Sequence, residues 1–167
     1  MMSVNITRAS ARPGEEIAFS FEISAEELGL EHPDYVIAGP VSVTGSVMNT
    51  GSVYRLTGSI RCSKSFVCDR CLGDFTQQQE HSFSEDFRSG DAENDGSEAV
   101  NYFHGDAIDV APLVRDTILA AQPLNNICSP DCLGLCPKCG GNLNEGDCGC
   151  DRFIPDPRLA ALQQLKK

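Results

Sequence analysis

Apolar and polar residues alternate along the first half of the chain, and this pattern predicts β-strands. Between residues 16 and 24, every second side chain is apolar, which is the period of a half-buried strand. The apolar members are Ile17, Phe19, Phe21 and Ile23. Residues 24–30 are expected to form a short helical turn with Ser24 as its N-cap.

Two valine-containing segments, residues 41–47 and 53–60, predict a hairpin. Asn49-Thr50-Gly51 lies between them and contains residues that tolerate the left-handed backbone of a tight turn. Gly58 interrupts the second segment, so a bulge is expected there.

The second of these strands is expected to continue into a longer hairpin. Residues 61–68 extend it, and the aromatic spacing that begins at Phe75 indicates a returning strand. This arrangement places Cys68 and Cys71 at the tip of a long hairpin.

One main helix is predicted over residues 110–122, with Asp109 as its cap and Pro123 after its end. Its apolar face consists of Leu113, Val114, Ile118 and Ala121. Residues 89–98 are polar and acidic and predict a solvated loop. A short C-terminal helix is expected over residues 156–167, with a stripe of leucines suited to core packing or docking.

The composition narrows the class of protein. No apolar run approaches the roughly 20 residues that a membrane helix needs, and residues 1–10 lack the features of a secretory signal. We therefore expect a cytoplasmic chain without membrane contact. Its nine cysteines, an odd number, are then expected to be reduced and to favour metal binding over disulfides.

The charge is strongly negative and unevenly distributed. The formal net charge is −11, and residues 80–116 contain ten acidic residues and two arginines. Such a surface is unsuited to DNA and favours basic proteins as partners. A local basic patch offers a candidate RNA contact, although a solvated strand face is the slightly favoured interpretation. The patch consists of Arg55, Arg61, Lys64 and Arg70.

The cysteine spacing predicts two metal sites. Cysteines separated by two residues can bind one ion together, and structural sites are closed by four ligands that usually come as two close pairs. The first group would clip the hairpin tip to the end of the helix, and the second would fold a small ribbon on itself. The first consists of Cys68, Cys71, Cys128 and Cys132; the second consists of Cys136, Cys139, Cys148 and Cys150.

Two details test this grouping. Cys148 and Cys150 can reach the same ion only if Gly149 makes a turn, and Pro130 disfavours a regular helix between Cys128 and Cys132. The ninth cysteine, Cys62, is interpreted as a small buried apolar residue on a strand.

Zinc, with two ions, is the favoured metal, and iron is the alternative because four thiolates suit both. Catalytic signatures are sparse: the chain has no His-Glu-x-x-His pair, phosphate loop or Gly-x-Ser-x-Gly elbow. A redox function for Cys68-Asp69-Arg70-Cys71 would require a helix starting at the motif, and none is predicted. We therefore do not expect an enzyme.

Together these elements predict an α+β fold. Residues 1–123 would form a β-rich antiparallel body with one main helix, and residues 124–155 a small cysteine-rich, zinc-ribbon-like lobe, followed by the C-terminal helix. A chain of 167 residues can bury one modest core beside a lobe stapled by metal.

The order of motifs resembles the YceD family, the large ribosomal RNA subunit accumulation proteins of bacteria and chloroplasts. The similarity extends over roughly residues 39–165. It is carried by Cys68-Asp69-Arg70-Cys71-Leu72, Pro112-Leu113-Val114-Arg115, the segment from Cys132 to Asn144, Cys148-Gly149-Cys150 and Asp156-Pro157-Arg158-Leu159. The resemblance implies a factor that supports 23S rRNA production or accumulation, with no established active site.

Three functional hypotheses follow. The first is a zinc-bearing assembly factor that holds a ribosomal protein or an rRNA segment of the large-subunit precursor. The second is an acidic adaptor that shields a basic ribosomal protein without touching RNA. The third, least favoured, is a thiol redox or RNA-processing enzyme, which would need a reactive thiol or a metal with an open position.

Overall fold

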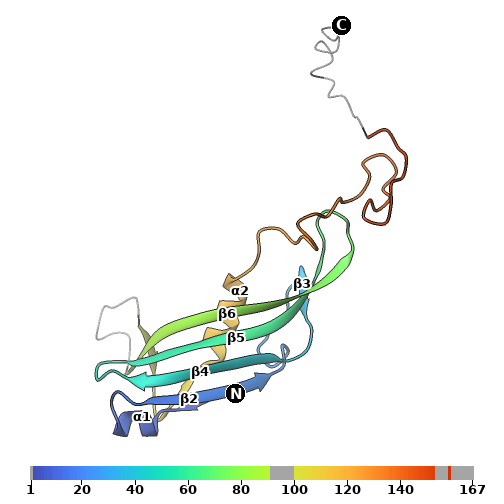
Figure 1. Ribbon diagram of the computed structural model, residues 1–167. Helices are drawn as coiled ribbons and strands as arrows, with labels where there is room; N and C mark the ends of the chain where they lie inside the picture. The colour runs from blue at the N-terminus through green and yellow to red at the C-terminus, as the bar shows by residue number, and fades with distance from the viewer. Residues whose placement is uncertain (1, 91–99, 153–157, 159–167) are drawn as a thin grey trace. The chain divides into compact units, whose positions relative to one another are not determined.

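The computed structural model of the chain describes residues 2–90, 100–152 and 158, and these form two compact units (Figure 1). Unit 1 consists of Met1–Phe66 and Phe75–Leu124, and unit 2 of Val67–Asp74 and Asn125–Lys167. The hairpin tip therefore belongs with the cysteine-rich segment, whereas the predicted body, residues 1–123, included it. The predicted C-terminal helix, apart from Arg158, lies outside the described residues, as does the acidic loop beyond Ser89 and Gly90.

A six-stranded sheet organises unit 1. Its strands are β2 (Glu16–Ile23), β3 (Tyr35–Ile37), β4 (Val41–Asn49), β5 (Tyr54–Val67), β6 (Asp74–Ser89) and β7 (Asn101–Phe103). The order is β2-β4-β5-β6-β7, and β3 also pairs with β5. The pairs β2–β4, β3–β5 and β4–β5 are antiparallel, which confirms the predicted class of sheet, whereas β7 pairs with β6 in parallel.

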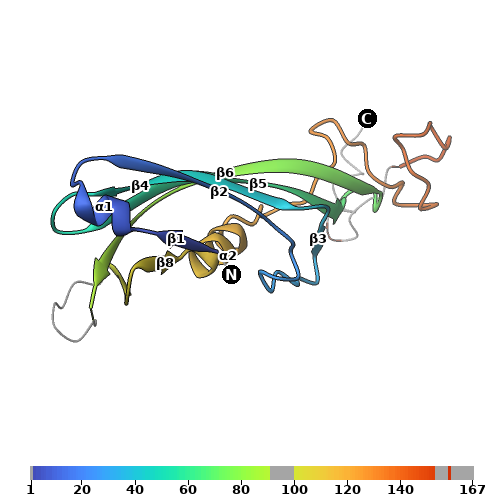
Figure 2. The same cartoon turned by 90° about the horizontal axis from the view of Figure 1, so that it is seen from below.

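The other elements of unit 1 lie on one face of this sheet or at its end. They are β1 (Ser3–Asn5), α1 (Thr7–Ala11), β8 (Ala107–Asp109) and α2 (Ala111–Ala120). Strands β1 and β8 form an antiparallel ribbon, and Figure 2 shows this ribbon and α2 on the same side of the sheet. Val114 and Ile118 of α2 are fully buried in the core with Val43, Leu56 and Ile60.

The main helix begins one residue later than predicted. Val110 occupies the N-cap position, while the Asp109 side chain accepts a hydrogen bond from the Ala111 amide at 3.0 Å. Asp109 thus satisfies a free amide of the first turn without being the cap itself. At residues 24–30, Ser24 and Glu27 form reciprocal hydrogen bonds, but the segment makes turns and no helix.

The predicted bulge at Gly58 is wrong, because β4 and β5 pair without interruption and Gly58 lies opposite Gly45. A Cβ atom added to Gly58 would lie 2.7 Å from Cζ of Phe83 and against the carbonyl of Thr44. A Cβ atom added to Gly45 would lie 2.8 Å from Cζ of Phe19. Glycine is needed here because aromatic rings cover the backbone, and the ladder is undisturbed.

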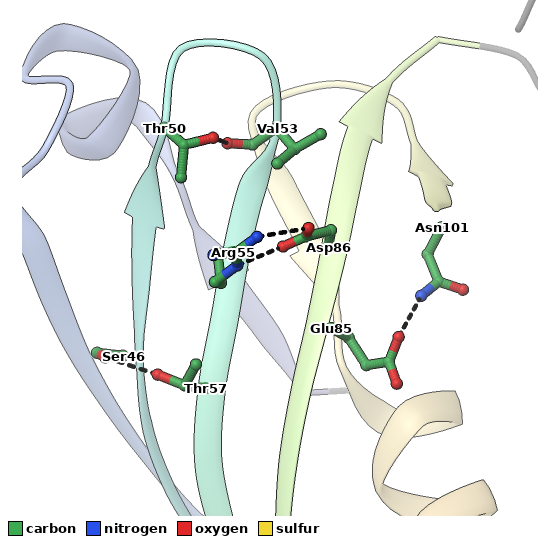
Figure 3. Close-up of polar contacts among 8 residues, drawn as sticks. All are labelled: Ser46, Thr50, Val53, Arg55, Thr57, Glu85, Asp86 and Asn101. Carbon is green, nitrogen blue, oxygen red and sulfur yellow. Dashed lines mark hydrogen bonds and ion pairs between the residues drawn. The ribbon is translucent and has the colours of Figure 1, made fainter. Parts of the chain in front are cut away.

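Polar pairs line the face of the sheet that points away from the apolar core (Figure 3). Arg55 of β5 forms two hydrogen bonds with Asp86 of β6, at 2.8 and 2.9 Å, and Ser46 contacts Thr57 at 3.3 Å. The predicted hairpin turn between β4 and β5 is present: Gly51 has a φ of +95°, and its amide donates a hydrogen bond to Asn49 Oδ1. The described residues contain no helix long and apolar enough to cross a membrane.

Candidate metal centres

Two knuckles of the same backbone geometry supply half of the cysteine ligands in unit 2. In the first, the Leu72 amide donates to the Cys68 carbonyl at 2.9 Å and the Cys68 amide donates to the Gly73 carbonyl at 2.9 Å. In the second, Gly140 and Cys136 form the corresponding bond at 2.9 Å, and Cys136 and Gly141 at 2.8 Å. The two Cys-x-x-Cys motifs therefore fold as equivalent turns.

Site 1 combines the first knuckle with a loop that follows α2 by several residues. The structure brings together the sulfur atoms of Cys68, Cys71, Cys128 and Cys132, all within 4.8 Å of one another. Reciprocal backbone and side-chain bonds between Asp69 and Asn126, both 2.8 Å, hold the loop against the knuckle. Pro130 lies in the loop between the second pair of cysteines, as the sequence indicated.

Site 2 closes a small ribbon in the same unit. The sulfur atoms of Cys136, Cys139, Cys148 and Cys150 also lie within 4.8 Å of one another. Gly149 has a φ of +69°, which turns the chain so that both neighbouring cysteines face the group. Asp147 supports this turn by accepting a bond from the Gly149 amide at 3.3 Å.

The spacing of the sulfur atoms fits a tetrahedral metal. In site 1 the separation is 3.9 Å between Cys68 and Cys132 and 3.8 Å between Cys71 and Cys128. A tetrahedron with metal–sulfur bonds of 2.3 Å has edges of about 3.8 Å. Four soft sulfur donors at this spacing can hold zinc or iron, and all eight predicted ligands fall into the two predicted groups.

The thiols of each group differ in acidity. Amide hydrogen bonds, chiefly from Cys128 in site 1 and Cys139 in site 2, lower the pKa of Cys68 and of Cys136 to about 6. The sulfur of Cys132 raises the pKa of Cys128 to about 12, and that of Cys148 raises the pKa of Cys150 to about 12. Four negative thiolates repel one another unless a cation lies between them.

Asn144, in the ribbon closed by site 2, contacts a ligand of site 1. Its Nδ2 donates to Cys132 Sγ at 3.3 Å, and its Oδ1 accepts a bond from the Leu133 amide at 2.8 Å. This contact is the main cause that lowers the pKa of Cys132. Asn144 therefore stabilises the thiolate form of Cys132, a ligand of site 1, although Asn144 itself lies in the ribbon closed by site 2.

Leu72 is the only non-glycine residue with positive φ among the described residues, at +56°. Gly140 occupies the equivalent position of the second knuckle with a φ of +73°. A left-handed backbone costs a residue with a side chain about 1–2 kcal/mol, so glycine would be favoured at both positions.

The basic patch is only partly exposed. Lys64 is fully buried, so its assignment as an RNA contact is wrong. Arg55 pairs with Asp86, Arg61 pairs with Glu80 at 3.1 Å, and Arg70 donates to the carbonyls of Pro130 and Cys132. Arg70 lies in unit 2, whereas the other three belong to unit 1.

Sequence reasoning missed the contacts of Lys64. Its Nζ donates to the Ile118 carbonyl at 3.2 Å and lies 4.6 Å from the centre of the Tyr35 ring. The alternation along the strand indicated that Lys64 is buried, because Lys64 is separated by an even number of positions from Leu56 and Ile60, which face the core. Cys62 has the same parity and is buried, with 4% of its surface exposed, as predicted.

These features define a class: a two-unit chain with an antiparallel sheet and two four-cysteine centres. The profile of the family described as the large ribosomal RNA subunit accumulation protein YceD matches residues 56–166. This match covers more than half of the chain and includes every cysteine of the two centres. The chain belongs to the YceD family.

Relatives extend the similarity beyond the matched region. The chain is 28% identical over 164 residues to the chloroplastic YCED homolog 1 of Arabidopsis thaliana, covering 80% of this chain and 51% of that protein. An uncharacterized protein of Mycobacterium tuberculosis is 26% identical over 98% of this chain and 81% of its own length. The YlbN protein of Bacillus subtilis is 26% identical over 99% and 97%. No solved structure matches the chain.

Proposed function

We propose that the chain is a non-catalytic, zinc-binding factor of the cytoplasm that supports 23S rRNA accumulation and assembly of the large ribosomal subunit. The observation that carries this proposal is the presence of two closed groups of four sulfur atoms in a member of the YceD family. Four protein ligands leave no position for a substrate water, which is typical of structural zinc.

The metal is tested first. Native mass spectrometry with elemental analysis, on protein purified without added metal, is expected to find two zinc ions. One ion should be lost on Cys68→Ser and the other on Cys139→Ser, while Cys62→Ala, outside both groups, should retain both. Iron, or a single ion in the unaltered protein, would contradict this part of the proposal.

The cellular role is tested by deleting the gene and restoring it in variant form. We expect a lower ratio of 23S to 16S rRNA and fewer complete large subunits in the deletion strain. The unaltered gene and the Cys62→Ala gene should restore both, and Cys68→Ser should not. Normal 23S rRNA and subunit profiles in the deletion strain would refute the role.

Contact with a basic ribosomal protein, without direct RNA contact, is the second candidate. It is favoured by the burial of Lys64 and by the pairing of Arg55, Arg61 and Arg70, which reduce the positive surface available to phosphate. Co-purification that survives nuclease treatment but fails at high salt is the expected result.

A thiol redox function has less support. The first knuckle is joined by Cys128 and Cys132, so its thiols form part of a closed group and not an accessible pair. Alkylation of the metal-loaded protein should therefore be slow. Rapid labelling of Cys71 would favour redox chemistry instead.

A further inference from the structure

Three exposed aliphatic side chains flank the ligands of site 1. Val67 precedes Cys68, Leu72 follows Cys71 and Leu133 follows Cys132, with 50%, 63% and 66% of their surfaces exposed. Each of the three is the neighbour in sequence of a ligand of one centre, whose sulfur atoms lie within 4.8 Å of one another. We call Val67, Leu72 and Leu133 the knuckle surface.

Among the three residues of the knuckle surface, Leu72 gives the clearest indication of a binding function. The two knuckles have the same backbone hydrogen bonds, and the second uses glycine where the first uses Leu72. Packing within unit 2 does not account for the leucine, because most of its side chain is exposed. A side chain held in an unfavourable backbone conformation and left mostly uncovered indicates a function outside the folded unit.

The charge of unit 2 limits what can cover this surface. Residues 67–74 and 125–152 contain six acidic and three basic residues, and residues 153–167 add one acidic and three basic residues. Each zinc bound by four thiolates contributes about −2, so the loaded unit carries about −5. This charge repels nucleic acid phosphates and attracts basic protein segments.

We propose that the knuckle surface binds a basic protein segment that presents an apolar side chain to Leu72. The inference deepens the proposed function and rests on it, because the two metal centres supply much of the negative charge. Aliphatic side chains offer an apolar contact to a protein, whereas the stacking of RNA bases uses aromatic or arginine side chains.

The test uses full-length, zinc-loaded protein and two separate probes. One is the set of basic proteins extracted by salt from purified large ribosomal subunits and freed of RNA by nuclease; the other is protein-free 23S rRNA. At low salt, the unaltered chain is expected to retain a basic protein that mass spectrometry identifies. Leu72→Gly and Leu133→Ser should each raise the dissociation constant for that protein at least tenfold.

Matched controls separate contact from folding. Val36→Ser changes an aliphatic residue of unit 1 that is 69% exposed, and it should bind as the unaltered chain does. Leu72→Gly installs the residue that the second knuckle already uses, so both zinc ions should remain and unit 2 should be at least as stable.

Several results would overturn the inference. They are unchanged binding by Leu72→Gly, loss of zinc from that variant, retention of 23S rRNA in place of a protein, and failure of the unaltered chain to retain a protein. The proposed function fails separately, through absent zinc or through normal 23S rRNA in the deletion strain. The inference is refuted while the proposed function stands if the Leu72→Gly gene restores 23S rRNA in the deletion strain, the Cys68→Ser gene does not, and the Leu72→Gly protein binds its partner with unchanged affinity.

Discussion

Lys64 carries a buried amine on the core face of β5. Burial lowers the pKa of this amine below its ordinary value, with a smaller opposing effect from Cys62. The unfolded chain therefore binds more protons than the folded chain between the lowered pKa and the ordinary value of about 10.4. In that window the free energy of unfolding rises with pH, and the penalty is fully present below the lowered pKa.

Replacing Lys64 by methionine tests this account. The Ile118 carbonyl would still accept a bond from Gln122 Nε2 at 2.7 Å, so no acceptor is left unsatisfied. We expect Lys64→Met to be neutral or to stabilise unit 1 by about 1 kcal/mol at neutral pH, with the advantage decreasing as pH rises towards 10. Urea unfolding at several pH values measures this, and a clear loss of stability at pH 7 would contradict it.

Asn144 is expected to act as an outer support of site 1. Loss of such a partner typically costs 10–100-fold in metal affinity, so Asn144→Ala should accelerate zinc release from site 1 by about that factor. Release to a chelator with a colour change gives the rate. Asn125→Ala, which alters an exposed asparagine of the same unit, is the control, and equal release rates for the two variants would exclude a role for the Cys132 contact.

At the scale of elements, the β4–β5 pair depends on two facing glycines. Gly58→Ala would push a methyl group into the Phe83 ring and the Thr44 carbonyl, so unit 1 should lose about 1–3 kcal/mol of stability. Ser20→Ala, at an exposed position of β2, should change stability by less than about 0.5 kcal/mol. Denaturant unfolding of both variants makes the comparison. A similar small effect at Gly58 would mean that Phe83 moves aside without cost.

At the scale of the whole molecule, the two units should respond differently to loss of metal. Unit 1 has its own apolar core, whereas unit 2 is held by two sulfur groups and short hydrogen-bonded turns. Chelation or Cys139→Ser should therefore unfold the region of site 2 and leave the sheet intact, since structural zinc supplies much of the folding free energy of such lobes. Hydrogen exchange resolved by region is the measurement. Protected amides at residues 136–150 after complete chelation would contradict it.

Much of the fold and of the two metal centres follows from patterns among residues that are close in sequence. Alternation fixes which face of a strand is apolar, so β2 and the hairpin tip with Cys68 and Cys71 could be predicted. The spacing of cysteines similarly predicts the two groups, because ligands must lie close in sequence to form a knuckle. Periodicity cannot reveal the short β1, α1 and β8, which take their structure from packing and pairing with distant segments.

Other properties depended on what lies opposite each residue in space. The requirement for glycine at position 58 comes from the ring of Phe83. The burial of Lys64 depends on a hydrogen bond to the carbonyl of Ile118, 54 positions away. Asn144 reaches Cys132 only because the two centres share one folded unit. The left-handed backbone of Leu72 likewise follows from the knuckle hydrogen bonds. The sequence determines which side chains are able to be buried or to bind a metal. Long-range contacts decide which of them do so, because burial and coordination depend on residues that are close in space but distant in sequence.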